Sequence, residues 1–420
     1  MKRYRNFFCA LVATGATLCV CHGAAAVVIA PWVDSFSSQN PLNINRFAVH
    51  TVNGTGLSGI GEAGDTHINA INGVSWTTVG NLGPTPLTDY DPQITYDLGG
   101  LINVDTLRIW NDNNPGSSQL GTKDIEVFAG ATLGTMTSRG TISLAQGTEL
   151  ATYTGEDFAV NYTGVRFVQF DIKSNHDGAL LNGEGPGNGG TDGRFLTGLA
   201  EVRIEGAIAG ETLVAPFVHA FSSELTALGR QAANSVNGSG LTGIGNLGDA
   251  HDVVEGNQFW TTAGNLGGGF GTDFDPEITF DLGGVVNVTK IREWGYNNSA
   301  ITFIGPDLVE IFTSTDGSTF ISQGTVNFAQ ASGLNTYGGN DIAVDLQGIR
   351  YIKLDILTNH DGAVFDGTGV LGGTLDPRSL TGLSEIRFVV NSVTIPTPAA
   401  LPAGLALLGL AMGRRRRVRR

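Results

Sequence analysis

Cysteine is nearly absent from this chain. Only three of its 420 residues are cysteines, and all three (Cys9, Cys19 and Cys21) lie among the first 26 residues. A body without cysteine has no disulfide, no thiolate nucleophile and no cysteine-bound metal. Its stability must therefore come from the burial of apolar side chains, with or without help from bound cations.

The first 26 residues have the pattern of a secretory signal peptide. Three basic residues within the first five precede an apolar run over residues 7–21, and Ala24, Ala25 and Ala26 supply the small residues that a signal peptidase accepts. The apolar run is shorter than the roughly 20 residues that a membrane span needs. We therefore predict export with removal of residues 1–26 rather than a membrane anchor.

Positive charge is also scarce. The chain has 24 lysines and arginines against 39 acids, and nine of the basic residues lie in residues 1–26 and 414–420, which contain no acid. The remaining body has 15 basic residues against 39 acids, a net charge near −24. Such a surface repels phosphate backbones, which excludes nucleic-acid binding, and suits a soluble extracellular protein or one that holds divalent cations.

The C-terminal end resembles the PEP-CTERM sorting signal of Gram-negative bacteria. Pro396 and Pro398 precede an apolar stretch over residues 399–412 and an arginine cluster over residues 414–420. The usual motif has Glu between its prolines, where this chain has Thr397. The resemblance implies recognition by an exosortase, transient anchoring in the inner membrane with the arginines on the cytoplasmic side, and delivery to the outer cell surface or extracellular matrix.

The body consists of one module present twice. Residues 52–203 reappear at 236–387 with a constant offset, as in Asn175-His176-Asp177-Gly178 and Asn359-His360-Asp361-Gly362. A period this long indicates a duplicated globular domain and not a solenoid repeat. We predict a first module over residues 27–206, a linker over 207–213, a second module over 214–391 and the sorting tail over 392–420.

Both modules have the pattern of β-structure. Short apolar runs are separated by turns rich in glycine and asparagine, and no window sustains a helical apolar period with caps. The 61 glycines of the chain also favour turns over helices. The predicted strands of the first module, two of which recur at 278–282 and 288–294, are Ile94–Leu98, Val104–Trp110, Asp124–Phe128, Thr141–Leu144, Val165–Ile172 and Leu199–Ile204. We predict an all-β fold of two sandwiches, each large enough to bury its own core.

Several of these segments together resemble the discoidin, or coagulation-factor type C, module. They are Asp97-Leu98-Gly99-Gly100, Asp124-Ile125-Glu126-Val127-Phe128 and Gly198-Leu199-Ala200-Glu201-Val202-Arg203, with closer counterparts in the second copy such as Phe280-Asp281-Leu282-Gly283-Gly284. The resemblance covers nearly all of the body. It implies two tandem galactose-binding-like jelly-roll β-sandwiches, a scaffold that hosts binders of carbohydrate, lipid and protein.

The resemblance also implies calcium. In the family a carboxylate in the last strand often closes a calcium site with an aspartate from an earlier loop, and the matching pairs here are Asp65 with Glu201 and Asp249 with Glu385. Hard oxygen ligands of this kind suit calcium. The alternative is that Asp65 caps a turn while Glu201 pairs with an arginine such as Arg203.

Aromatic and amide residues at strand ends form the candidate ligand site. An aromatic ring can stack on a sugar while nearby amides bond its hydroxyls, although Trp110 fits a core position equally well. The candidate ligand residues are Trp110, Asn113, Asn114 and Arg194 in the first module, and Trp294, Asn297, Asn298 and Arg378 in the second.

No motif for catalysis stands out. The sequence has no HExxH, GxSxG or P-loop pattern, and His176 and His360 lie among turn-forming residues, where a structural role is favoured. Our leading hypothesis is non-catalytic binding of extracellular polysaccharide, with two modules giving avidity. A structural matrix role without a specific small ligand is the alternative, and a carbohydrate-active enzyme comes third.

Overall fold

The computed structural model describes residues 26–40, 46–69, 73–79, 88–183, 195–253, 258–263, 273–368 and 380–393. Nearly all of the predicted signal peptide, the predicted sorting tail from residue 394 onward, Arg194 and Arg378 lie outside the described residues.

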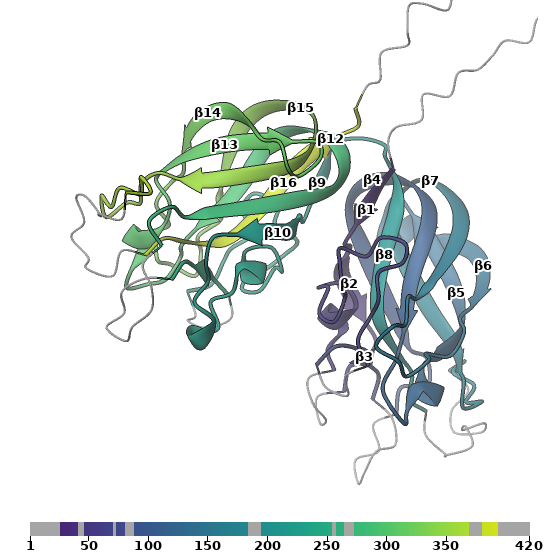
Figure 1. The fold of residues 1–420 in the computed structure, drawn as a ribbon. Helices are drawn as coiled ribbons and strands as arrows, with labels where there is room; N and C mark the ends of the chain where they lie inside the picture. The colour runs from purple at the N-terminus through teal and green to yellow at the C-terminus, as the bar shows by residue number, and fades with distance from the viewer. Residues whose placement is uncertain are drawn as a thin grey trace, which may run out of the picture. The chain divides into compact units, whose positions relative to one another are not determined.

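Each module is one antiparallel sheet of eight strands (Figure 1). The strands of the first module are β1 (Ala26–Ile29), β2 (Trp32–Phe36), β3 (Trp76–Thr77), β4 (Gln93–Asn111), β5 (Thr122–Gly130), β6 (Thr137–Ser143), β7 (Glu156–Asn175) and β8 (Gly198–Ile208). Those of the second are β9 (Thr212–Val214), β10 (Phe217–Phe221), β11 (Trp260–Thr261), β12 (Glu277–Gly295), β13 (Leu308–Ser314), β14 (Ile321–Asn327), β15 (Asn340–Ile356) and β16 (Gly382–Asn391).

The two sheets have the same topology. The order in the first is β1-β8-β4-β7-β5-β6, with β2 also paired to β4 and β3 to β8. The second repeats it as β11-β16-β12-β15-β13-β14, with β10 on β12 and β9 on β16. The predicted all-β fold and duplication are therefore confirmed, and both modules are antiparallel jelly-roll sandwiches.

Long bent strands turn each sheet into a sandwich. The sequence predicted two strands where β4 runs unbroken from Gln93 to Asn111. β4 pairs with β2 before the Gly99-Gly100 corner and with β8 after it, so one strand takes part in both layers. Gly99 takes a φ of 76°, which glycine adopts freely, and its N–H donates to Asp97 Oδ1 at 2.9 Å. The second module repeats this corner at Gly283.

The core lies between the layers of each sandwich. Apolar side chains of β4, β7 and β8 fill it in the first module, and those of β12, β15 and β16 fill it in the second. Trp76, Trp110, Trp260 and Trp294 are fully buried. The middle of β7 is buried on both faces, which agrees with the imperfect alternation of its sequence.

The helices in the described part of the chain are all short 3-10 turns. They are η1 (Ala48–Thr51), η2 (Ser118–Leu120), η3 (Leu133–Thr135), η5 (Thr226–Leu228), η6 (Ala232–Ser235) and η7 (Thr302–Ile304). No helix in the described part of the chain has the length and apolarity to span a membrane.

The predicted linker over residues 207–213 is mostly strand. β8 continues to Ile208 and β9 begins at Thr212, so only residues 209–211 lie between strands. The small residues Gly206 and Ala207 suggested a linker in the sequence. In the structure they are part of β8 and pair with Val104 and Asn103 of β4.

Candidate functional site

The two tryptophans predicted to stack on sugar are core residues. Trp110 and Trp294 are fully buried, and their Nε1 atoms donate to the backbone oxygens of Asp65 at 3.1 Å and Asp249 at 2.9 Å. Trp110 packs against Tyr153 and Ala200. Neither ring presents a face to solvent. Both tryptophans therefore have the core position that the sequence left open, and neither ring is available to stack on a sugar.

The amides predicted to bond sugar hydroxyls connect loops inside the protein. Asn113 Nδ2 donates to Leu150 O at 2.8 Å, and its Oδ1 accepts the N–H of Glu149 at 2.7 Å. In the second module Asn297 makes the matching bonds to Leu334 O at 3.0 Å and from Gly333 N at 2.9 Å. Both amides are buried, so they fix the loop above them rather than contact a ligand.

Asn114 and Asn298 are likewise buried. Asn114 Nδ2 donates to Asp112 Oδ1 at 2.5 Å, and Asn298 Oδ1 accepts the N–H of Ala300 at 2.9 Å. These side chains stabilise the turns that follow the tryptophans.

The loop that each buried asparagine holds carries exposed groups. Leu150 and Leu334, at equivalent positions, are each 59% exposed. In the same loop as Leu150, Gln146 Nε2 donates to Ser118 Oγ at 2.8 Å, and the second module repeats this contact from Gln330 Nε2 to Thr302 Oγ1 at 3.0 Å. We call Ser118, Gln146 and Leu150 the first rim, and Thr302, Gln330 and Leu334 the second rim.

A carboxylate lies next to the first rim and has no counterpart next to the second. Glu149 has a φ of 61° and is the sole non-glycine residue with a positive φ in the described part of the chain, where the second module has Gly333 at 69°. Its Oε1 accepts the Ser118 hydroxyl at 2.7 Å, and hydrogen bonds from the Gly116 backbone and Ser118 lower the pKa of Glu149. An L residue in this conformation is strained, and such strain persists where surrounding contacts or function require the side chain.

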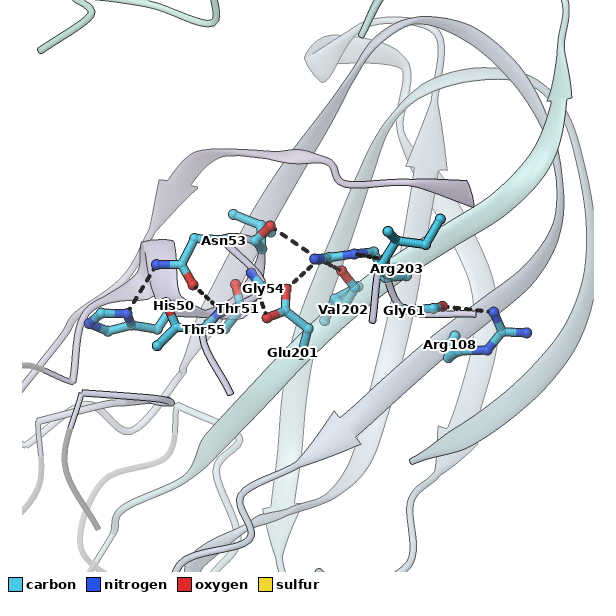
Figure 2. A network of polar contacts seen from close by, with 12 residues as sticks. His50, Thr51, Asn53, Gly54, Thr55, Gly61, Arg108, Glu201, Val202 and Arg203 are labelled. Atoms are coloured by element: carbon cyan, nitrogen blue, oxygen red, sulfur yellow. Dashed lines mark hydrogen bonds and ion pairs between the residues drawn. The ribbon is translucent and has the colours of Figure 1, made fainter. Parts of the chain in front are cut away.

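The carboxylates predicted to bind calcium have other partners. Glu201 is fully buried, pairs with the guanidinium of Arg203, and accepts the Gly54 N–H at 3.0 Å, as Figure 2 shows. Glu385 pairs with Arg387 and accepts the Gly238 N–H at 2.8 Å. Burial raises the pKa of Glu201 and of Glu385 to about 7, and the arginine in each pair opposes that rise.

Asp65 and Asp249 cap turns. Asp65 Oδ2 accepts the N–H groups of Gly61 and Glu62, both at 2.8 Å, and Asp249 does the same in the second module. Among the described residues there is no group of three His, Cys, Asp or Glu side chains that could hold a metal ion. The geometry thus matches the alternative interpretation, and the calcium prediction rests on the sequence alone.

Two arginines hold the glycine-rich loop that covers the pair in the first module. Arg203 Nε donates to Ile60 O at 2.9 Å. Arg108 Nη1 donates to Gly61 O at 2.8 Å (Figure 2). Arg108 also pairs with Asp157 at 2.6 Å. Loop carbonyls that could have served a cation accept hydrogen bonds from guanidinium groups instead.

The histidines have structural surroundings. Burial lowers the pKa of His67 and His176, and of His251 and His360 in the second module, which keeps these imidazoles neutral at pH 7. Asn175, beside His176, donates to Leu196 O at 2.8 Å and closes a loop. The sequence expectation of a structural role agrees with these contacts.

Solved structures similar to this chain include carbohydrate-binding domains and an enzyme. The carbohydrate-binding module CBM32-3 from a family 31 glycoside hydrolase of Clostridium perfringens is 16% identical, with 42% of this chain and 92% of that chain covered and a TM-score of 0.28. The fucolectin from Morone saxatilis serum is 15% identical (87% and 97% covered, TM-score 0.27), and allantoicase is 11% identical (86% and 90%, TM-score 0.33). At these scores the likenesses carry no argument about activity. No protein-family model and no curated protein matches the chain.

Sequence reasoning missed Glu149 and the rims. The signal was the difference between the copies, because Glu149 stands where the second copy has Gly333 and Glu293 stands where the first has Ile109. The sequence prediction relied on residue types that often bind sugars, which are tryptophan and asparagine. The side chains that reach the surface of these loops are instead a leucine, a glutamine and a strained glutamate.

Proposed function

We propose that the chain is a non-catalytic secreted protein that binds extracellular polysaccharide through the two rims. One observation carries the proposal: the same exposed leucine and the same hydrogen-bonded hydroxyl and glutamine pair recur at equivalent positions of both modules. In each module a buried asparagine fixes the loop that carries the leucine. A pre-fixed loop loses little conformational entropy when it binds.

The rims have the chemistry of a weak sugar site. An exposed leucine can cover the C–H face of a pyranose, while the exposed glutamine amide exchanges hydrogen bonds with sugar hydroxyls. The hydroxyl behind each glutamine, on buried Ser118 and half-buried Thr302, holds the amide in place. The acidic body repels anionic polymers, so the expected ligand is a neutral polysaccharide. Two weak sites on one chain raise the apparent affinity for a repeating polymer.

The sorting pattern supports the location of this activity. With a signal peptide over residues 1–26 and a PEP-CTERM-like tail over 392–420, we propose that the body reaches the outer surface or the matrix of a Gram-negative cell. Extracellular polysaccharide is abundant there, and an exosortase would remove the tail. Intact mass spectrometry of protein from the native host tests this: a mature extracellular form that still ends at Arg420 would contradict the sorting assignment.

The binding proposal is tested with the full chain on a glycan array and then by titration with the best neutral polysaccharide. Leu150→Ser and Leu334→Ser should each weaken binding about threefold to tenfold, and the double variant should lose more because avidity is lost as well. Leu133→Ser is the matched control, since Leu133 is 48% exposed on η3 and lies outside both rims.

Three outcomes would contradict the proposal. Equal losses in the control variant would show a general surface effect. A wild-type chain that binds no polysaccharide would favour the structural matrix role. Release of new reducing ends from the polysaccharide would show an enzyme.

A further inference from the structure

A carboxyl group lies in the core of the second module. Glu293 occupies a position of β12 where the first module has the buried Ile109 of β4. Its side chain is fully buried. A carboxyl group in such a place has to be hydrogen-bonded, paired with a cation or protonated.

Glu293 holds both ends of the loop that carries the second rim. Its Oε1 accepts the N–H of Ala329 at 3.3 Å, at the start of the loop, and Asn340 Nδ2 at 3.1 Å, at its end. Asn340 Nδ2 also donates to the Tyr337 hydroxyl at 2.8 Å. Between these contacts lie Gln330 and Leu334 of the second rim.

The other carboxyl oxygen, Oε2, is buried and has no hydrogen-bond partner among the described residues. No lysine, arginine or histidine of the described residues forms an ion pair with it. Across the sheet β15 presents Asn340 and β16 presents Ile386, and the loop adds Tyr337, whose pKa is raised by burial and by Glu293 itself. An ionised Glu293 would therefore be a buried charge without a counter-ion.

The charged neighbours along each strand are already paired. Arg292 pairs with Asp341 at 2.6 Å, and Arg387 pairs with Glu385. Since successive side chains of a strand point to opposite faces, these pairs lie on the face away from Glu293. On the loop after β15, His360 lies 3.7 Å from Asp307, and burial lowers its pKa, so it adds no positive charge at neutral pH.

We propose that Glu293 is a pH-sensitive clasp that keeps the loop over residues 328–339 closed in acid and loosens it as the pH rises toward neutrality. The first module has no such device, because Ile109 cannot ionise. Control of ligand binding by this clasp rests on the proposed function, but opening of the loop does not.

The sign follows from where the proton is bound. Burial raises the pKa of Glu293 from its usual 4.5 to about 7, so the closed loop binds a proton that the open loop releases. Stability of the closed loop is full below pH 4.5, is lost between pH 4.5 and about 7, and is level above that. Glu201 and Glu385 also titrate in this range, but they are equivalent residues of the two modules and so affect both alike. Half-buried Asp355, whose pKa rises to about 6, is present in every variant and therefore does not change the comparison between variants.

The test is hydrogen exchange of the full chain at pH 5.5 and 8.5, expressed as protection factors to remove the intrinsic effect of pH. Protection of residues 328–339 should fall about tenfold at the higher pH, while the equivalent loop at 144–155 changes much less. Glu293→Gln should remove most of the fall, since glutamine has the same shape and does not ionise. The double change Glu293→Ile with Asn340→Glu should reproduce the behaviour of the first module.

Two results would overturn the clasp. One is wild-type protection in residues 328–339 that is the same at both pH values. The other is a wild-type fall that persists in Glu293→Gln. If the clasp responds but glycan binding does not change with pH, the clasp stands and the role of the second rim fails.

Discussion

In both modules a backbone N–H at the start of the same loop donates a hydrogen bond to a carboxylate, but the carboxylate lies on a different strand in each. In the first, the N–H of Ala145 donates to Glu156 of β7 at 2.6 Å, and Glu156 lies across from Ile109. In the second, the equivalent N–H of Ala329 donates to Glu293 of β12, which lies across from Asn340. The accepting carboxylate thus lies on β7 in the first module and on the neighbouring strand β12 of the second, at the two positions of one cross-strand pair. The hydrogen bond from the loop N–H is present in both modules.

This comparison shows which feature the fold requires. A backbone N–H at the start of the loop has to be satisfied, and either strand can supply the oxygen. The consequences differ, because Glu156 is partly exposed whereas Glu293 is fully buried. Either arrangement satisfies the loop N–H, but only the second module has, in Glu293, an ionisable side chain buried at this position.

A second exchange concerns an arginine that is half-buried in the first module and buried in the second. Arg46 lies 3.8 Å from Asp112 in the first module, and in the second Arg230 lies over the ring of Tyr296 at 5.9 Å from its centroid. An ion pair in one copy is thus a cation–π contact in the other, and both place a cation beside the turn after the tryptophan.

The largest effect is expected where the copies agree. Glu201→Ala and Glu385→Ala each leave an arginine buried without its partner, and each should lower the free energy of unfolding of its module by about 3–5 kcal/mol. Chemical denaturation of the full chain measures this. Replacing both partners by apolar residues, as in Glu201→Leu with Arg203→Met, should cost less than the single change. An equal or larger cost would mean that the pair adds net stability.

The buried asparagines come next. Asn113→Ala and Asn297→Ala should each lower the free energy of unfolding by about 2 kcal/mol, because each change leaves buried backbone groups unsatisfied. The effects should be similar in the two modules, since the bonds are the same. Full stability with weaker glycan binding would instead restore a direct ligand role for these amides.

The strands and their duplication were predictable because they depend on local patterns. Apolar runs and glycine turns placed strands near 94–110, 124–128 and 165–172, and the offset between copies fixed their recurrence. The prediction broke β4 at Gly99-Gly100, because a sequence does not distinguish a corner within a strand from a turn between strands.

The site was less predictable because burial depends on contacts distant in sequence. Trp110 and Asn113 have the residue types of a sugar site, but Asp65, 45 residues earlier, and Leu150, 37 residues later, cover them. The sequence is equally compatible with calcium at Glu201 and with a pair between Glu201 and an arginine such as Arg203. Nothing in the sequence ranked it above a metal site.

A smaller effect is expected from exchanging the strained residue between the rims. Glu149→Gly should raise the melting temperature of the first module by about 1–2 °C, because glycine adopts the positive φ without strain. Gly333→Glu should lower that of the second module by a similar amount. If Glu149 also bonds ligand, the stabilised variant binds polysaccharide more weakly. A lower melting temperature in Glu149→Gly would show that its bonds to Ser118 outweigh the strain.

The smallest effect is expected from removing metal. A calcium site that binds only the folded chain would raise the melting temperature by a few degrees at a hundredfold excess over its dissociation constant. The oxygens of Asp65 and Glu201 already accept hydrogen bonds from backbone N–H groups and Arg203, as do their counterparts in the second module. We therefore expect chelator to leave both melting transitions in place, as measured by calorimetry after metal analysis confirms removal. A shift of several degrees that Glu385→Gln abolishes in the second module would show that calcium displaces Arg387, and would restore the calcium prediction.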